Sequence, residues 1–397
     1  GWRPVSWRSA HKASRSTPAD LQHQLTWGYA GQALRRRAQA KTFRLGNSLV
    51  WKGSALEQYV GLDVSQEQTS VCVLDTSGRI VWQGRCASLP EALASIIRAR
   101  APHAVKIGLE AGPLSSWLWH ELQAMGLPVV CLDPRHAKAA LAAQVNKTDK
   151  NDAFGLAQIV RTGWSREVRV KSFARHALRG LLTSRAQLVR TRVDLANQIR
   201  GVLKPFGVSV GKGGGQTFAD RAGEGGTALP SLQPVIEALL QAWRCVSEQI
   251  GILDRLVLAK ARQDEAVRRL MTVPGVGVIT ALAFVGTIGD PARFRRSSST
   301  GAYLGLTPRR YQSGEVDRSG RISKCGDPLT RTYLFEAAGM LLTRVTRWSA
   351  LKAWGTRLAK RVGRKKAIVA LARKLAVLLH RIWQDGPEVR WSKEAVA

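Results

Sequence analysis

Hydrophobic residues between positions 59 and 141 fall into short runs typical of β-strands, separated by stretches in which apolar residues have helical spacing. Three β-rich runs come first, and helices and strands then alternate. The predicted strands cover residues 59–64, 69–75, 79–84, 104–110 and 128–133, and predicted helices begin near residues 90, 115 and 135. A meander followed by alternating helices and strands predicts a mixed sheet covered by helices, and therefore an α/β N-terminal domain over residues 59–165.

Hydrophobic residues beyond this domain repeat every seven positions, which is the spacing of a coiled coil. Two such series predict two long helices; they contain Leu181, Leu188, Leu195 and Val202, and Ile236, Trp243, Ile250 and Val257. The glycine-rich link between them includes GKGGG at residues 211–215, which departs from the phosphate-binding pattern GxxxxGK and is interpreted as a flexible linker. We interpret residues 170–265 as a coiled-coil arm that folds on itself or pairs between subunits. Ordinary core packing within one chain is the alternative.

The two ends of the chain differ in pattern. Residues 266–397 are mostly helical by their spacing, and the last predicted helix, over residues 365–383, combines one apolar face with many basic residues. Residues 1–58 contain four tryptophans and an arginine run but show neither helical nor strand periodicity. We interpret them as an extension outside the folded domains, formed by translated upstream sequence, with a transit peptide as the alternative.

Charge limits the classes of partner. The chain of 397 residues carries 61 Lys and Arg against 28 Asp and Glu, a formal net charge of +33. Such an excess disfavours a compact state unless a polyanion neutralises it, so nucleic acid is the expected partner. The sequence contains no run of about 18 apolar residues, which argues against a membrane role. Five widely separated cysteines without a CxxC pair support neither a disulfide framework nor a zinc site, and we expect a cytoplasmic, nucleoid-associated protein.

Two acidic residues stand at the ends of predicted strands. Asp63 interrupts the apolar first strand, and Glu110 closes the fourth. If these strands are neighbours in the sheet, the two carboxylates lie close together, where like charges are costly without a cation. Asp149 and Asp152 are spaced i, i+3 at the start of a predicted helix, so they share one face and can meet the strand pair. Four carboxylates without a nearby His or Cys suit Mg2+, which stabilises charge on a phosphate during strand cleavage.

A simpler interpretation exists for the helix pair. Acidic residues in the first turn of a helix are favoured by capping and by the helix dipole, and Thr148 is itself a suitable N-cap. Taken alone, Asp149 and Asp152 are therefore better explained by helix stability. A carboxylate inside an apolar strand has no such explanation, because burying it unpaired is costly. Together the four acids favour catalysis.

Two further segments carry phosphate-binding chemistry. Gly275 and Gly277 follow Pro274 in a tight turn before a helix, whose backbone N–H groups can hold a phosphate; an ordinary helix-to-helix turn is the alternative. Residues 307–326 form a loop in which basic residues surround three serines. These residues are Arg309, Arg310, Arg318, Arg321 and Lys324, and Ser313, Ser319 and Ser323. A serine hydroxyl among guanidinium groups is a candidate nucleophile on a phosphodiester. Composition alone favours the alternative, a DNA-binding loop whose serines only donate hydrogen bonds to phosphate.

Six motifs along the chain resemble, in order and spacing, those of the DEDD transposases of the insertion-sequence family numbered one hundred and ten. The motifs are GLDVS at Gly61, GLEAGPLS at Gly108, NKTDKNDA at Asn146, PGVG at Pro274, and GLTPRRYQSG followed by GRISKCGD. The resemblance extends from about residue 59 to the last helix. It implies an RNase H-like (RuvC-like) N-terminal domain and, over residues 266–397, a separate transposase domain with a catalytic serine.

The resemblance also implies site residues and partners. Asp63, Glu110, Asp149 and Asp152 would form a Mg2+-binding tetrad, and the RRYxSG segment of the family assigns the catalytic serine to Ser313. Members are site-specific recombinases that act on donor and target DNA; some are guided by a structured RNA, and a homo-oligomer, expected to be a tetramer, is implied. Two alternatives remain open: a structure-selective nuclease that uses the same carboxylates to activate water, and a non-catalytic nucleic-acid-binding protein.

Overall fold

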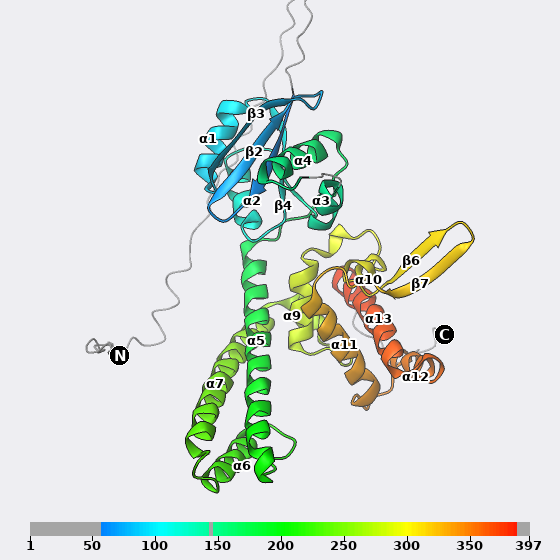
Figure 1. The fold of residues 1–397 in the computed structure, drawn as a ribbon. Coiled ribbons are helices and arrows are strands. Elements are labelled where there is room, and N and C mark those ends of the chain that lie inside the picture. The colour runs from blue at the N-terminus through cyan, green and yellow to red at the C-terminus, as the bar shows by residue number, and fades with distance from the viewer. Residues whose placement is uncertain (1–56, 143–145, 387–397) are drawn as a thin grey trace, which may run out of the picture. The chain divides into compact units, whose positions relative to one another are not determined.

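The computed structural model describes residues 57–142 and 146–386 (Figure 1). The extension expected over residues 1–58 therefore lies almost entirely outside the described residues. Within them the chain forms an α/β domain, then two long helices with a shorter helix between them, and then a mostly helical region that contains one β-hairpin.

A five-stranded sheet with the order β3-β2-β1-β4-β5 forms the centre of the N-terminal domain. Its strands are β1 (Gln58–Val64), β2 (Gln68–Leu74), β3 (Ile80–Ala87), β4 (Ala104–Glu110) and β5 (Val129–Leu132). β1 pairs antiparallel with β2 and parallel with β4, whereas β3 pairs antiparallel with β2 and β5 pairs parallel with β4. The predicted mixed sheet, with the first and fourth strands as neighbours, is thus confirmed.

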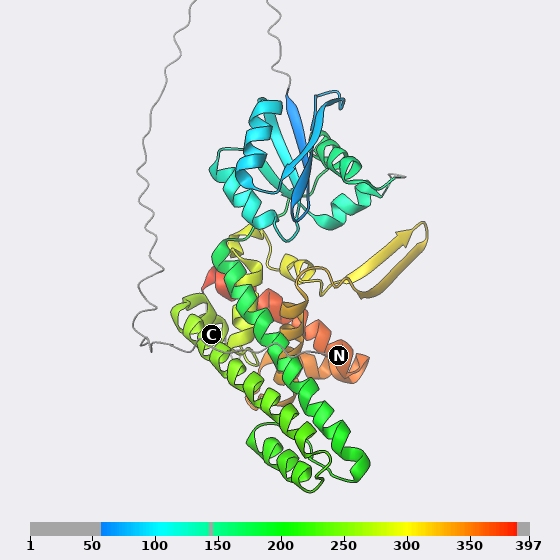
Figure 2. The same ribbon diagram turned by 60° about the vertical axis from the view of Figure 1, so that its left-hand side comes forward.

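Helices cover both faces of this sheet, as Figure 2 shows. They are α1 (Pro90–Arg100), α2 (Ser115–Ala124), α3 (Pro134–Leu141) and α4 (Asp149–Thr162). Alternate residues of β1 divide between the two faces: Val60 and Leu62 pack in one cluster with residues of α1 and α2. On the opposite face Cys72 and Leu74 of β2 pack against Ala153 of α4. Because strand residues alternate between faces, α4 covers the face to which Gly61 and Asp63 belong.

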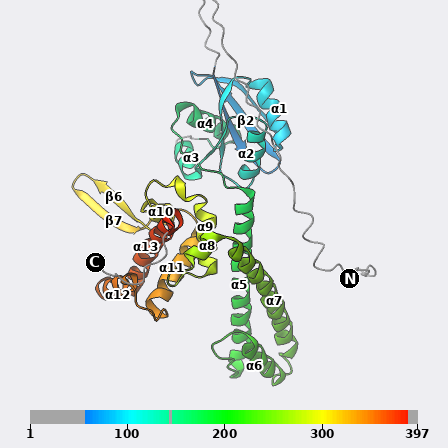
Figure 3. The same cartoon turned by 180° about the vertical axis from the view of Figure 1, so that it is seen from behind.

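The two heptad series form the long helices α5 (Phe173–Leu203) and α7 (Gln233–Gln263), which run side by side (Figures 1 and 3). Ile236, Trp243, Ile250 and Val257 of α7 are all buried, as a packed heptad face requires. The two helices pack on each other within one chain. Because Ile236 and Trp243 belong to a core shared with α6, and Val257 to the core of the C-terminal region, ordinary core packing accounts for this burial as well, and the coiled-coil arm stays a prediction.

The stretch GKGGG at residues 211–215, interpreted as a flexible linker, lies outside the helices, but the segments on either side of it are helical. These segments are the short helix η1 (Lys204–Phe206) and helix α6 (Gln216–Thr227). Phe218 of α6 packs in a separate core with Ile199 of α5 and Trp243 of α7. Gly226 allows close approach to α7, because a Cβ atom there would lie 3.0 Å from Cγ2 of Ile236. This glycine of α6 thus serves close packing, whereas an added Cβ atom at Gly213, Gly214 or Gly215 would meet nothing within 4 Å.

The C-terminal region is built around the apolar helix α9. Its elements are α8 (Glu265–Leu270), α9 (Val278–Ile288), η2 (Pro291–Arg293), α10 (Ser299–Tyr303), α11 (Pro328–Thr343), α12 (Ala350–Val362) and α13 (Arg364–Asp385). Phe284 of α9 is fully buried, as are Leu371 and Leu375 of α13, so the predicted final helix packs through the expected face. None of the helices in the described part of the chain is long and apolar enough to span a membrane.

The basic segment expected as a loop is instead a β-hairpin, formed by β6 (Pro308–Ser313) and β7 (Val316–Ile322). Figures 2 and 3 show it extending away from the helices. Nearly all of its residues are exposed on both faces. The alternation of apolar and polar residues that identifies a strand arises from burial of one face, so this hairpin lacks that signal.

Candidate functional site

Two glycines allow helix α4 to lie directly on the centre of the sheet. A Cβ atom on Gly61 of β1 would lie 2.1 Å from the carbonyl oxygen of Ala153 and 2.4 Å from the backbone nitrogen of Ala157. A Cβ atom on Gly108 of β4 would lie 2.5 Å from Cγ1 of Val160. Because only glycine permits such an approach, these two positions set the distance between α4 and the strands beneath it.

The same two strands supply two carboxylates to the face that α4 covers. Asp63 and Glu110 each follow one of these glycines by two residues, so their side chains project on the same side of the sheet as the glycines. They lie one position beyond Leu62 and Leu109, which pair on neighbouring parallel strands. The predicted proximity of the two strand-end acids follows from this register.

Helix α4 contributes the other two carboxylates from its first turn. Thr148 is the N-cap, and its hydroxyl oxygen accepts a hydrogen bond of 3.2 Å from a backbone N–H three residues later. Asp149 and Asp152 each precede by four residues a buried side chain, Ala153 and Leu156, and therefore share the helix face that packs on the sheet. Since Thr148 caps the helix, capping does not account for Asp149.

The four carboxylates act on one another electrostatically. Burial, reinforced by the negative charges of Asp152, Asp149 and Glu110, raises the pKa of the Asp63 carboxyl to about 6. Burial and the charge of Asp152 also raise the pKa of Glu110, and Lys147 opposes both shifts. Negative charge is thus concentrated at this edge of the sheet, the condition under which a bound cation stabilises a site.

The four carboxylates are suitable ligands for Mg2+, although their side chains are not arranged around a single point. Within residues 57–142 and 146–386, no group of three or more His, Cys, Asp or Glu side chains is arranged to hold a metal ion. One of the four acids is engaged elsewhere: Oδ2 of Asp149 accepts a hydrogen bond of 3.0 Å from Nη2 of Arg85. All four groups offer only carboxylate oxygens, the ligands that Mg2+ prefers. The residues fit this cation by their chemistry, but side chains of more than one of them would have to move to hold it, and Asp149 would also have to turn from Arg85.

Ser313 stands at the tip of the hairpin. It ends β6 and pairs with Val316 across a two-residue turn, in which Gly314 has a φ of +54°. Two-residue hairpin turns of one common type require glycine at this first central position. Ser313 is exposed, so a large substrate can reach its hydroxyl group.

The pairing register of the hairpin separates Ser313 from Ser319. Residues paired across antiparallel strands share a face, and faces alternate along each strand. Ser313 therefore shares a face with Tyr311 and Arg318, whereas Ser319 pairs with Arg310 on the opposite face. The side chain of Tyr311, 65% exposed, offers an aromatic surface next to Ser313.

Arg310 and Arg318, the two arginines at the centre of the hairpin, lie on opposite faces and differ in their contacts. Arg310 donates two hydrogen bonds to Asp317, of 2.8 and 2.6 Å, and this contact lowers the pKa of the Asp317 carboxyl. The guanidinium of Arg310 is therefore held by a carboxylate on the face away from Ser313. Arg318 is the arginine whose strand position places it diagonally across from Ser313.

The third serine belongs to the base of the hairpin. The backbone N–H of Ser323 donates to the carbonyl oxygen of Thr307 at 2.8 Å, and its own carbonyl oxygen accepts from Nη2 of Arg309 at 3.3 Å. Lys324 follows with a φ of +54°, a backbone conformation that L-residues rarely adopt. Its N–H donates to the carbonyl oxygen of Gly305 at 3.1 Å. Ser323 is thus part of an anchored base, and Ser313 is part of an exposed tip.

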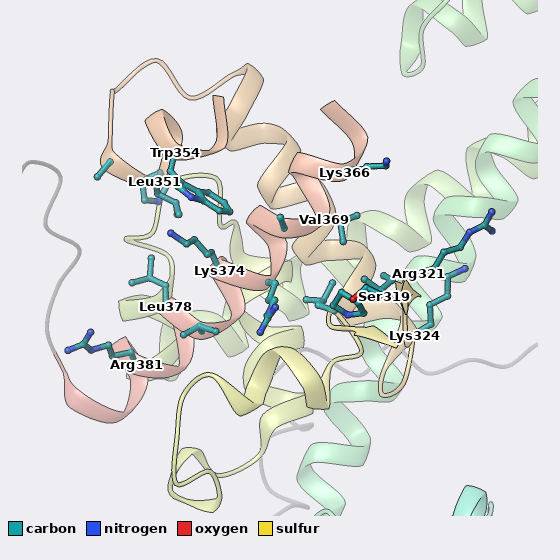
Figure 4. A pocket seen from close by; sticks show the side chains of 18 of the residues that line it. Ser319, Arg321, Lys324, Leu351, Trp354, Lys366, Val369, Lys374, Leu378 and Arg381 are labelled. Carbon is teal, nitrogen blue, oxygen red and sulfur yellow. The ribbon is translucent and has the colours of Figure 1, made fainter. Parts of the chain in front are cut away.

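A groove of about 1730 Å3 opens beside the base of the hairpin, between β7, α12 and α13 (Figure 4). Apolar side chains line it, including Leu351, Trp354, Val369 and Leu378. Its cationic residues are Arg321, Lys324, Lys366, Arg373, Lys374 and Arg381, and no acidic residue is among the described residues that line it. Nζ of Lys374 lies 4.0 Å from the centre of the Trp354 ring. A groove with this charge suits a phosphate backbone.

The two glycines of the PGVG turn have different surroundings. Gly275 has a φ of +82°, and a Cβ atom on it would lie 2.6 Å from the carbonyl oxygen of Ala337 in α11. Its presence is explained by packing against α11. Gly277 is the exposed N-cap of α9. The nucleic-acid contact predicted for both glycines stays a prediction.

Sequence reasoning missed three contributors to these sites. Gly61 and Gly108 carry a readable signal, because each precedes a strand-end acid by two residues on the same face. Arg85 carries none, since its partner Asp149 lies 64 residues further along the chain.

Comparison with known proteins identifies the family. A DEDD-type transposase model of the IS110 group matches residues 60–207, and the model of the transposase IS116/IS110/IS902 family matches residues 267–373. The transposase for insertion sequence element IS1111A of Coxiella burnetii is 30% identical over 331 residues, which cover 81% of this chain and 88% of the relative. The chain belongs to the IS110 family of transposases.

Other relatives of this transposase are similar over comparable lengths. A probable family 20 transposase of Pseudomonas aeruginosa is 28% identical over 326 residues, or 81% of this chain and 95% of the relative. The transposase for insertion sequence element IS1328 of Yersinia enterocolitica is 26% identical over 321 residues, or 80% and 94%. All six motifs of the transposase fall inside the two matched regions, whereas α6 and α7 lie between them.

Proposed function

We propose that this transposase cuts and rejoins DNA through Ser313 and a Mg2+-binding tetrad of Asp63, Glu110, Asp149 and Asp152. The observation that carries the proposal is that two strand-end carboxylates and two carboxylates from the first turn of α4 lie on the same side of the sheet, with the pKa of Asp63 raised to about 6 by burial and by its acidic neighbours. A divalent cation bound there would stabilise negative charge on the scissile phosphate.

We infer the roles of the domains from the resemblance to the IS110 family. Residues 59–165 would form an RNase H-like domain, residues 170–265 a coiled-coil arm, and residues 266–397 the transposase domain with the serine. The sheet order β3-β2-β1-β4-β5, in which β2 alone runs antiparallel to the others, supports the first assignment. Residues 1–58 would be an extension that contributes to none of these roles.

The serine chemistry conserves the phosphodiester bond. Oγ of Ser313 forms a bond to phosphorus, the bond from phosphorus to the adjoining strand oxygen breaks, and the released strand takes up the serine proton as a hydroxyl. The hydroxyl of a partner strand then attacks the phosphoserine, which rejoins DNA and regenerates Ser313 without an outside energy source. Arg318, on the same face of the hairpin, would stabilise the negative charge of the transition state.

The remaining basic residues would hold nucleic acid without reading its sequence. Arg309, Arg321 and Lys324 lie at the base of the hairpin, and the last two line the groove. Because the chain carries far more positive charge than one scissile site uses, we infer that a guide RNA binds together with donor and target DNA.

The helices α5 and α7 would hold subunits in a homo-oligomer, expected to be a tetramer. Sequencing of RNA that co-purifies with the protein tests the guide, and light scattering tests the assembly.

The test of the central proposal is a covalent protein–DNA adduct. Labelled element-end DNA, with co-purified RNA and Mg2+, should give a shifted band on a denaturing gel, and peptide mapping should find the DNA on Ser313. Ser313→Ala should remove the adduct, whereas Ser319→Ala and Ser323→Ala should keep it, because Ser319 lies on the other face and Ser323 in the base.

Other outcomes of this experiment would favour one of the two alternative functions, a nuclease or a non-catalytic nucleic-acid-binding protein. Strand breaks without any adduct in the parent protein would favour a nuclease that activates water, with Ser313 only binding phosphate. Binding without strand breaks would favour a non-catalytic role. Strand breakage retained by Asp63→Ala would contradict the metal assignment in either enzymatic function.

A further inference from the structure

Arg85 lies at one end of a row of polar residues that crosses three strands of the sheet. Asp63 pairs with Ser70 of β2, and Ser70 pairs with Arg85 of β3. Residues paired in this way share a face, so all three belong to the face that α4 covers. Adjacent strands lie about 4.8 Å apart, which puts the Cα atoms of Arg85 and Asp63 about 10 Å apart.

Side chains of strand β3 also hold the first turn of α4, which carries Asp149 and Asp152. Nε2 of Gln83, two residues before Arg85, donates a hydrogen bond of 2.8 Å to the carbonyl oxygen of Lys150. Nη2 of Arg85 donates to Oδ2 of Asp149 at 3.0 Å, and both side chains are about half exposed, at 50% and 58%. Asp149 is thus hydrogen-bonded to the edge strand β3, although its charge, like that of Asp152, still acts on Asp63.

We propose that Arg85 is a positioning residue that competes with the divalent cation for Asp149, and that its released guanidinium then binds a nucleic-acid phosphate at the edge of the sheet. The inference rests on the proposed function, since it takes the four carboxylates as the cation site. A carboxylate oxygen held by an arginine is a weaker ligand for a cation, because the positive charge beside it opposes the incoming charge. Cation binding and phosphate binding would then favour each other.

The affinity of the nucleic-acid-free protein for a divalent cation tests the first part of the proposal, that Arg85 competes with the cation for Asp149. Calorimetric titration of the nucleic-acid-free protein with Mn2+ should give about two- to fivefold tighter binding for Arg85→Gln, the range expected for loss of one exposed ion pair. Arg85→Lys should stay near the parent value, because it keeps the positive charge. The gain should shrink at high salt, which screens exposed charges. Arg98→Gln is the matched control, since Arg98 donates to the Met125 carbonyl oxygen instead of a carboxylate.

The affinity of the protein for nucleic acid tests the second part of the proposal, that the released guanidinium of Arg85 binds a phosphate. With Mg2+ present, Arg85→Gln should weaken binding to duplex DNA and lower the slope of log affinity against log salt by about one. With EDTA instead of Mg2+, the same substitution should change little, because Arg85 is then held by Asp149. A uniform loss under both conditions would contradict release of the arginine by the cation.

The outcomes separate this inference from the proposed function. Unchanged or weaker Mn2+ binding by Arg85→Gln, while the binding of the parent depends on Asp63, would overturn the role of Arg85 alone. Absence of any Asp63-dependent Mn2+ binding in the parent would overturn the cation site and this inference with it. If Arg85→Gln does not fold, Arg85→Met keeps the aliphatic stem without the charge and should show the same tighter binding.

Discussion

Gly61 lies directly beneath Ala153, so close that a single added carbon would meet the α4 backbone at 2.1 Å. We predict that Gly61→Ala destabilises the protein by about 1–3 kcal/mol, the usual range for overpacking a filled core. Since α4 carries Asp149 and Asp152, displacement of the helix should also weaken Mn2+ binding. Thermal unfolding and calorimetric titration measure the two effects.

Gly112→Ala is the control for this substitution. Gly112 belongs to the same domain, and the nearest contact of an added Cβ atom would be an ordinary 3.9 Å. It should leave the unfolding temperature nearly unchanged. Equal unfolding temperatures for Gly61→Ala and Gly112→Ala would show that α4 does not depend on the glycine.

A second prediction follows from the raised pKa of Asp63, about 6. Between about pH 4 and pH 6 the folded protein holds a proton at Asp63 that the unfolded chain has lost, so the free energy of unfolding falls as the pH rises. Asp63→Asn removes this charge and should raise the unfolding temperature most above pH 6, with the gain shrinking towards pH 4. Mg2+ added at pH 7.5 should stabilise the parent but not Asp63→Asn.

Asp75→Asn controls for the general effect of removing a carboxylate. The Ser77 hydroxyl and the Arg79 N–H donate to Asp75 and lower its pKa, the opposite direction to Asp63. Asp75→Asn should therefore not raise the unfolding temperature above pH 6. A stabilisation by Asp63→Asn that does not depend on pH would contradict the role of its charge.

Local patterns predicted most of the sheet domain. The helix expected to begin near residue 90 begins at Pro90, and the strand expected over residues 104–110 has these bounds in the structure. Asp63 and Glu110 could be placed at strand ends because one misplaced acid in an apolar run is visible in the sequence. Thr148 could be identified as a cap since its partner lies three residues away.

Contacts between distant segments could not be predicted in the same way. The fit of Gly61 against Ala153 and the ion pair of Arg85 with Asp149 depend on the tertiary structure. The hairpin over residues 308–322 was not predicted because both of its faces are exposed, and α6 was not predicted because the glycine-rich stretch just before it suggested a linker. Composition predicted phosphate binding for the basic segment and the family resemblance selected Ser313, whereas the strand register was needed to see that Arg318, and not Arg310, shares its face.

A third prediction concerns the groove beside the hairpin. Lys366→Gln and Arg321→Gln should each weaken binding to DNA of any sequence and lower the salt slope of binding by about one, because each removes one phosphate contact. Fluorescence anisotropy at several salt concentrations measures the slope. Arg98→Gln, in the sheet domain, should leave it unchanged. An undiminished slope in both groove variants would show that nucleic acid does not occupy the groove.

The last prediction separates the two arginines at the centre of the hairpin. Arg318 shares a face with Ser313, whereas Arg310 is held by Asp317 on the other face. Arg318→Gln should slow formation of the Ser313–DNA adduct by about 100-fold, as loss of one donor to a developing negative charge typically does. Arg310→Gln should slow it much less.

Single-turnover rates with saturating DNA measure this difference, because saturation removes the contribution of weaker binding. Asp317→Ala is the matched control. It frees Arg310 without moving it to the face of Ser313, so it should neither replace Arg318 nor rescue Arg318→Gln. If Arg310→Gln were instead the slower variant, the reacting phosphate would have to approach the face that carries Ser319. The assignment of Ser313 would then fail together with that of Arg318.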